Sequence, residues 1–129
     1  EVSPLDLGMI YLPWYKPTWM GEAGWWEPDA QPWTCQEWVM AYQAGDKAVA
    51  PRRDKVKALV ENPAQLDRLG PLLIVHDSGL KVKIIVDGCH RACAASILGK
   101  PLHVLSLESA WAHMLYPFDF AAHVRGQYW

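Results

Sequence analysis

The stretch that most constrains the fold is residues 86–91, which read V-D-G-C-H-R. The apolar run at residues 83–86 precedes it, and a run of small and apolar residues at 92–99 follows. The first run is rich in β-branched residues and predicts a buried strand. The second predicts a helix that ends at Gly99, because glycine favours helix C-termini and Pro101 cannot continue a helix. Residues 86–91 are therefore predicted to turn the chain from a strand into a helix.

A turn of this kind is a candidate anion site. Backbone N–H groups and the positive end of the helix dipole point to one place at a helix N-terminus. His90 and Arg91 add side-chain donors in the first helical turn, and the thiol of Cys89 lies between them and Gly88. We interpret the turn as an anion-binding element rather than as a connection alone.

Composition limits the classes of protein to which the chain can belong. The 129 residues are 51% hydrophobic and 20% charged, which is typical of one globular domain. The net charge of −2 argues against a strong overall attraction to nucleic acid. No apolar run approaches the roughly 20 residues that a membrane span needs. Three cysteines without a disulfide spacing indicate reduced thiols and a cytoplasmic protein.

The chain divides into three compositional regions of one predicted domain. Residues 1–50 hold six of the eight tryptophans and several prolines. We expect a first strand within residues 2–12, and a helix over residues 35–44 whose start is fixed by a capping box of Thr34 and Glu37. Most of the tryptophans are expected to form core, while Trp25 or Trp26 would line the site.

Residues 51–107 form the predicted core of the domain. A helix capped by Asp54 would break at Pro63, and a short helix over residues 64–69 would follow. Two strands, at 72–75 and up to residue 86, would form a hairpin about residues 76–79. A further strand is expected at 102–107. Residues 108–129 would supply a helix over 108–116 and a packed tail. The fold class is therefore α/β (α+β in some schemes), a small mixed sheet with flanking helices.

This order of elements, together with the D-G-C-H-R signature at residues 87–91, resembles the ParB/sulfiredoxin superfamily. The resemblance covers roughly residues 50–107, with an opening strand near residues 2–7. It implies that the turn binds nucleotide phosphates through the backbone of Gly88 and Cys89 and the side chains of His90 and Arg91.

The resemblance also extends to the helix before the hairpin. Lys55 matches a phosphate-binding lysine of sulfiredoxins, and Arg52 matches the Pro-Arg start of this helix in partition proteins. Asp87 stands where sulfiredoxins have a glycine, which is closer to the D-G-x-H-R pattern of free serine kinases and ParB-like nucleases. Asp87 would fix the turn or orient a metal-bound water.

The function that the resemblance implies is binding of ATP or a related nucleotide with Mg²⁺, coupled to phosphoryl transfer or hydrolysis. The acceptor would be a small molecule or a protein. One alternative is a sulfiredoxin-like thiol enzyme, in which Cys89 is catalytic and the helix N-terminus beside Arg91 lowers its pKa. The other is a non-catalytic ParB-like regulator that binds a protein or DNA, of which DNA is the less favoured. No metal site built by the protein is predicted.

Overall fold

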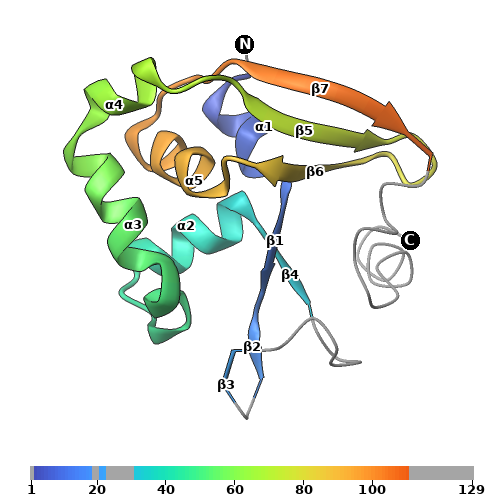
Figure 1. Ribbon diagram of the computed structural model, residues 1–129. Helices are drawn as coiled ribbons and strands as arrows, with labels where there is room; N and C mark the ends of the chain where they lie inside the picture. Colours follow the sequence, from blue (N-terminus) through green and yellow to red (C-terminus); the bar gives the residue numbers. More distant parts are fainter. Residues whose placement is uncertain (1, 19–20, 23–30, 111–129) are drawn as a thin grey trace.

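The computed structural model describes residues 2–18, 21–22 and 31–110, which form a mixed α/β fold around a five-stranded sheet (Figure 1). The strand order in this sheet is β4-β1-β6-β5-β7. Its strands are β1 (Tyr11–Tyr15), β4 (Pro32–Thr34), β5 (Leu72–Asp77), β6 (Val82–Asp87) and β7 (Val104–Ser109). A separate ladder pairs β2 (Pro17–Thr18) with β3 (Gly21–Glu22). The predicted small mixed sheet is confirmed.

The helices gather on one side of the sheet (Figure 1). They are α1 (Pro4–Gly8), α2 (Cys35–Gln43), α3 (Ala50–Glu61), α4 (Pro63–Arg68) and α5 (Cys89–Leu98), with a short 3₁₀ helix, η1 (Lys47–Val49), before α3. The main core lies between helices and sheet, where Leu72, Ile74 and Ile85 meet the buried face of α5. Within the described residues, no helix is long and apolar enough to cross a bilayer.

The predicted hairpin of β5 and β6 is confirmed. The two strands are antiparallel, and Val75 lies opposite Ile84. Buried Asp77 fixes the turn, because its carboxylate accepts hydrogen bonds from the backbone N–H groups of Gly79 and Leu80, each at 3.0 Å. A carboxylate that accepts local N–H donors mimics a backbone turn. The hairpin therefore delivers β6 to the signature residues in a fixed register.

The capping box of α2 is also confirmed. The Thr34 hydroxyl accepts a hydrogen bond from the backbone N–H of Glu37 at 3.2 Å, and the Glu37 carboxylate accepts one from the backbone N–H of Thr34 at 3.0 Å. This reciprocal pair satisfies two donors at the start of the helix. It also fixes the point at which β4 passes into α2.

The N-terminal expectation is wrong for residues 4–8, which form α1 rather than a strand. The Ser3 hydroxyl accepts a hydrogen bond from the backbone N–H of Asp6 at 3.3 Å, and a proline lies in the first turn. These helix-start signals outweigh the apolar pattern of the segment. The first sheet strand is β1, which runs parallel to β6.

Two further boundaries differ from the prediction. The helix expected to begin at Asp54 begins at Ala50, because Pro51 occupies the first turn, where its missing N–H is not needed. Glu108 and Ser109 were expected in a helix but belong to β7, since pairing with β5 continues to Asp77. The rest of the helix expected over 108–116, and the tail, lie outside the described residues apart from Ala110, which forms a turn.

Candidate functional site

The predicted strand-to-helix turn is confirmed at Gly88, between the end of β6 and the start of α5. Gly88 has a left-handed backbone (φ 93°, ψ 26°). A Cβ atom at this position would overlap Cδ2 of Leu72 and would lie 2.9 Å from Nη2 of Arg91. Both the backbone conformation and the space therefore require glycine. No side chain caps α5, so its first N–H groups have no acceptor from a capping side chain.

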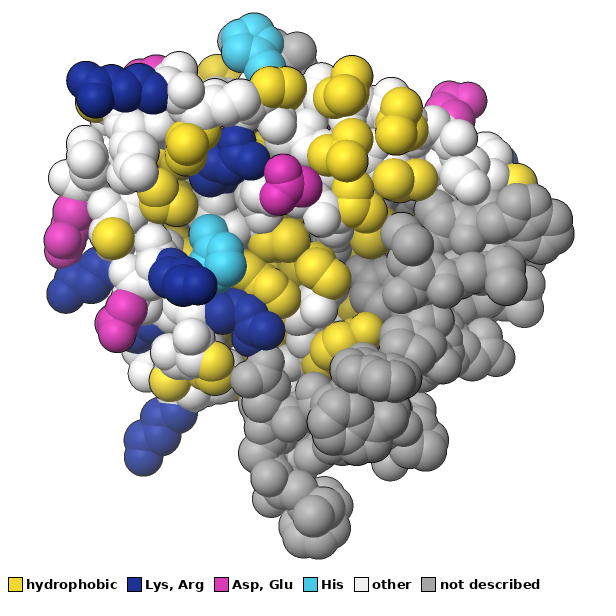
Figure 2. Space-filling view, viewed as in Figure 1, with side chains coloured by type: hydrophobic (Ala, Val, Ile, Leu, Met, Phe, Trp, Pro, Cys, Tyr) yellow, Lys and Arg dark blue, Asp and Glu magenta, His cyan; other side chains and the backbone are white. Residues whose placement is uncertain are grey.

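Three of the predicted site residues come together beside this turn. His90 lies in the first turn of α5, while Arg52 and Lys55 come from α3. Burial and the positive charges of Lys55 and Arg52 lower the pKa of His90. The positive charge of Arg52 also acts on the nearby thiol of Cys89, whose pKa it lowers against the larger effect of burial. Figure 2 shows Lys and Arg side chains gathered around a histidine on this face of the molecule. The fold thus brings a helix N-terminus and three basic side chains to one place.

Trp14 is a part of this site that the sequence did not predict. The centroid of its ring lies 4.8 Å from that of the His90 imidazole, and Arg52 Cζ lies 4.7 Å from the ring centroid. No local sequence pattern predicts these contacts, because Arg52 and His90 follow Trp14 by 38 and 76 residues in the chain. Trp25 and Trp26, one of which was expected to line the site, both lie outside the described residues.

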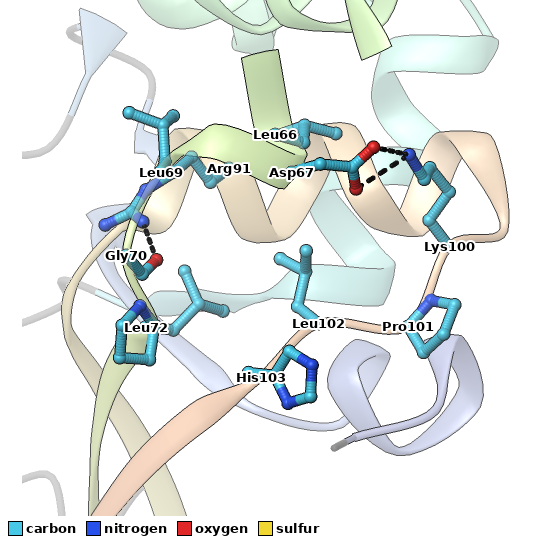
Figure 3. Close-up of a pocket in the computed structure, with 11 residues that line it drawn as sticks. Leu66, Asp67, Leu69, Gly70, Leu72, Arg91, Lys100, Pro101, Leu102 and His103 are labelled. Atoms are coloured by element: carbon cyan, nitrogen blue, oxygen red, sulfur yellow. Dashed lines mark hydrogen bonds and ion pairs between the residues drawn. The ribbon is translucent and has the colours of Figure 1, made fainter. Parts of the chain in front are cut away.

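Arg91 contacts the segment before β5 and the end of β6. Its guanidinium donates a hydrogen bond to the backbone carbonyl of Gly70 (Figure 3). Nη2 of the same side chain lies 3.8 Å from Oδ2 of Asp87. The side chain of Arg91 is 17% exposed, whereas that of Asp87 is 74% exposed. These contacts tie the signature turn to the segment before β5. The phosphate-binding role of Arg91 stays a prediction, and the structure gives the residue a bracing role.

Arg91 also lines a cavity of about 550 Å³ between α4, α5 and the start of β5 (Figure 3). Leu66, Leu72 and Leu102 supply apolar walls. At the rim, Lys100 Nζ donates to both carboxylate oxygens of Asp67 at 3.1 Å. The side chains of Arg91 and Lys100 are therefore both bound to oxygen atoms of the protein.

The cysteines behave as core residues. Burial raises the pKa of Cys89 to about 12, and the nearby Asp87 and Cys35 add to this rise. The backbone N–H of Cys89 and the charge of Arg52 lower this pKa, but burial outweighs both of them. The expectation of a lowered pKa at this thiol is therefore wrong, because desolvation of the thiolate exceeds the effect of the helix N-terminus. Cys93 is buried as well, and its Sγ lies 3.9 Å from that of Cys35.

The described residues contain no group of three or more His, Cys, Asp or Glu side chains placed to hold a metal ion. Comparison with models of protein families, with curated proteins and with solved structures found no match to this chain.

Replacing Gly88 by alanine should destabilise the fold by about 2–4 kcal/mol, which combines the left-handed backbone with overpacking against Leu72. Gly99 is a matched control: its φ is 67°, and no atom lies within 4 Å of an added Cβ. Gly99→Ala should cost only about 1 kcal/mol. Urea denaturation measures both free energies of unfolding. Equal losses for the two variants would show that the contact at Gly88 does not constrain the turn.

The thiol of Cys89 should resist iodoacetamide in the folded protein at pH 8 and react after denaturation in urea. Its folded pKa of about 12 lies above the unfolded value. The protonated thiol of Cys89 therefore stabilises the folded state fully at pH values below its unfolded pKa. This stabilisation is lost as the pH rises toward the folded pKa. The free energy of unfolding should fall by about 1–2 kcal/mol more between pH 8 and 10 in the wild type than in Cys89→Ala. Rapid alkylation of the folded protein would instead support a reactive thiol.

Proposed function

We propose that the protein binds the phosphates of ATP or a related nucleotide at the N-terminus of α5 and uses the nucleotide for phosphoryl transfer or hydrolysis. One observation carries the proposal: Arg52, Lys55 and His90 converge beside the Gly88 turn, where α5 begins without a capping side chain. Neighbouring cations repel one another, and a ligand with several negative charges relieves that repulsion. A polyphosphate also accepts hydrogen bonds from the N–H groups of a helix N-terminus.

Each group would have a distinct role toward the phosphates. The backbone N–H groups of Gly88 and Cys89 would donate to phosphate oxygens in line with the axis of α5. The planar fork of Arg52 suits two oxygens of one phosphate, whereas Lys55 would act as a point charge. His90 would donate a hydrogen bond in its protonated form.

Binding is expected to be linked to proton uptake by His90. In the free protein, burial and the charges of Lys55 and Arg52 lower the pKa of this imidazole. A bound phosphate would offset those charges and raise the pKa again. Affinity should therefore increase as the pH falls from 8 to 6, because the protonated imidazole binds the phosphate more strongly.

Mg²⁺ would belong to the nucleotide rather than to a site built by the protein. The described residues form no metal-binding cluster, and the exposed carboxylate of Asp87 lies near Arg91. Mg²⁺ is commonly held by substrate phosphates with few protein ligands. When it is bound with the nucleotide, it neutralises charge on the phosphates.

The buried thiol of Cys89 makes the sulfiredoxin-like alternative the weaker proposal, because attack by a thiolate needs ionisation and access. The free thiols suit a reducing compartment, so we place the proposed activity in the cytoplasm.

Calorimetric titration with ATP, ADP and CTP in the presence of Mg²⁺ tests binding. Arg52→Gln should weaken binding at least about ten-fold, as expected for loss of a charge-assisted contact. Arg53→Gln is the matched control, because it removes the same charge from the same helix. Arg53 lies over the ring of Tyr42, with Cζ 5.0 Å from the centroid, and its loss should change affinity less than about two-fold.

Absence of binding to all three nucleotides would contradict the proposal, as would equal effects of the two variants. Release of phosphate from the bound nucleotide, alone or to an added acceptor, tests the reaction. Binding without turnover would contradict phosphoryl transfer and hydrolysis and would favour the non-catalytic regulator.

A further inference from the structure

We infer that Trp14 is a positioning residue, which holds the side chains of Arg52 and His90 at the N-terminus of α5 in the orientation that receives phosphate. This inference rests on the proposed function, and it assigns a role to the aromatic-rich first third of the chain. Trp14 itself would not touch the phosphates.

The geometry places one ring between two elements of the site. Trp14 belongs to β1 and is 6% exposed. The imidazole of His90, from α5, lies 4.8 Å from it at an interplanar angle of 56°. The guanidinium of Arg52, from α3, lies 4.7 Å from its centroid. Two side chains from separate helices are therefore located by contact with the same indole.

An indole is suited to this position for an electrostatic reason. Arg52 and His90 are like charges when the imidazole is protonated, so each disfavours the other near the turn. The electron-rich face of tryptophan attracts cations and offsets part of this repulsion. An aliphatic side chain of similar size would fill the space without attracting either group.

Trp14 is in turn held by α2. Its ring meets Trp38 edge to face, with centroids 5.5 Å apart at 61°. Trp38 is 2% exposed and stacks on Tyr42, with centroids 5.6 Å apart at 23°. Because α2 begins at its capping box, this row of rings joins a fixed helix to the basic group. The orientation of Arg52 and His90 therefore depends on residues before position 50.

The test uses Trp14→Leu with Trp33→Leu as its matched control. Trp33 is also a buried tryptophan, 8% exposed, but the cation over its ring is Lys16, at 5.6 Å. The affinity for Mg²⁺·ADP is measured by calorimetry between pH 8 and 6, on variants whose circular dichroism shows them to be folded. Trp14→Leu should weaken binding about ten-fold and remove the gain in affinity at low pH. Trp33→Leu should keep the affinity for Mg²⁺·ADP within about two-fold of the wild-type value and retain the increase in affinity at low pH.

A ligand-free measurement separates this inference from the proposed function. Nitrogen-15 relaxation of Arg52 Nε reports the mobility of the guanidinium, and its order parameter should fall in Trp14→Leu but not in Trp33→Leu. If the wild type binds no nucleotide, the proposed function fails while this readout still decides whether Trp14 positions Arg52. Equal mobility and equal affinity in the two variants would overturn the inference.

A milder pair of substitutions covers the case in which Trp14→Leu does not fold. Trp14→Phe retains an aromatic face and should weaken binding of Mg²⁺·ADP about three-fold, because phenylalanine attracts cations less than tryptophan does. In the Arg52→Gln background, Trp14→Phe should weaken binding of Mg²⁺·ADP by less than it does in the wild type, because the guanidinium that Trp14 positions is already absent. Strictly additive effects would overturn the positioning role of Trp14.

Discussion

The contact on which the candidate site depends is the close approach of the Gly88 backbone to Leu72 and Arg91. The left-handed conformation of Gly88 ends β6 and begins α5 within one residue, and no larger side chain fits between the turn and β5. The guanidinium of Arg91 also donates a hydrogen bond to the carbonyl of Gly70 and so braces the turn. The start of α5 is therefore fixed relative to the sheet. The buried alanines of that helix pack into the main core and resist its displacement.

Because the start of α5 is fixed, the basic side chains lie around one defined place. Arg52 and Lys55 belong to α3 and His90 belongs to α5, so the basic group is built from two separate helices. Placing these charges together is unfavourable in the free protein: burial first, and then the charges of Lys55 and Arg52, lower the pKa of His90. Groups that disfavour one another without a ligand are typical of functional sites. We regard this stored repulsion as the physical basis of the proposed phosphate binding.

The sequence predicted the elements that depend on local signals. The capping box of Thr34 and Glu37, the hairpin of β5 and β6, and the turn at Gly88 each follow from neighbouring residues. Segments with competing signals were less predictable: Ser3 starts a helix in an apolar stretch, and sheet pairing carries β7 through Glu108. The pKa of Cys89 and the place of Trp14 depend on burial and on contacts between distant segments. No local pattern encodes either of them, so both required the folded structure.

Phosphate binding at the N-terminus of α5 can be tested residue by residue, by titrating the nitrogen-15-labelled protein with Mg²⁺·ADP and recording amide NMR spectra. We expect saturable shifts of the backbone amide signals of Gly88, Cys89 and His90 and of the side-chain signal of Arg52 Nε. The cavity beside Arg91 provides an internal control, because Lys100 and Leu102 should be little affected. Shifts centred on that cavity, or no saturable shift at residues 88–90, would show that the nucleotide does not bind at the start of α5.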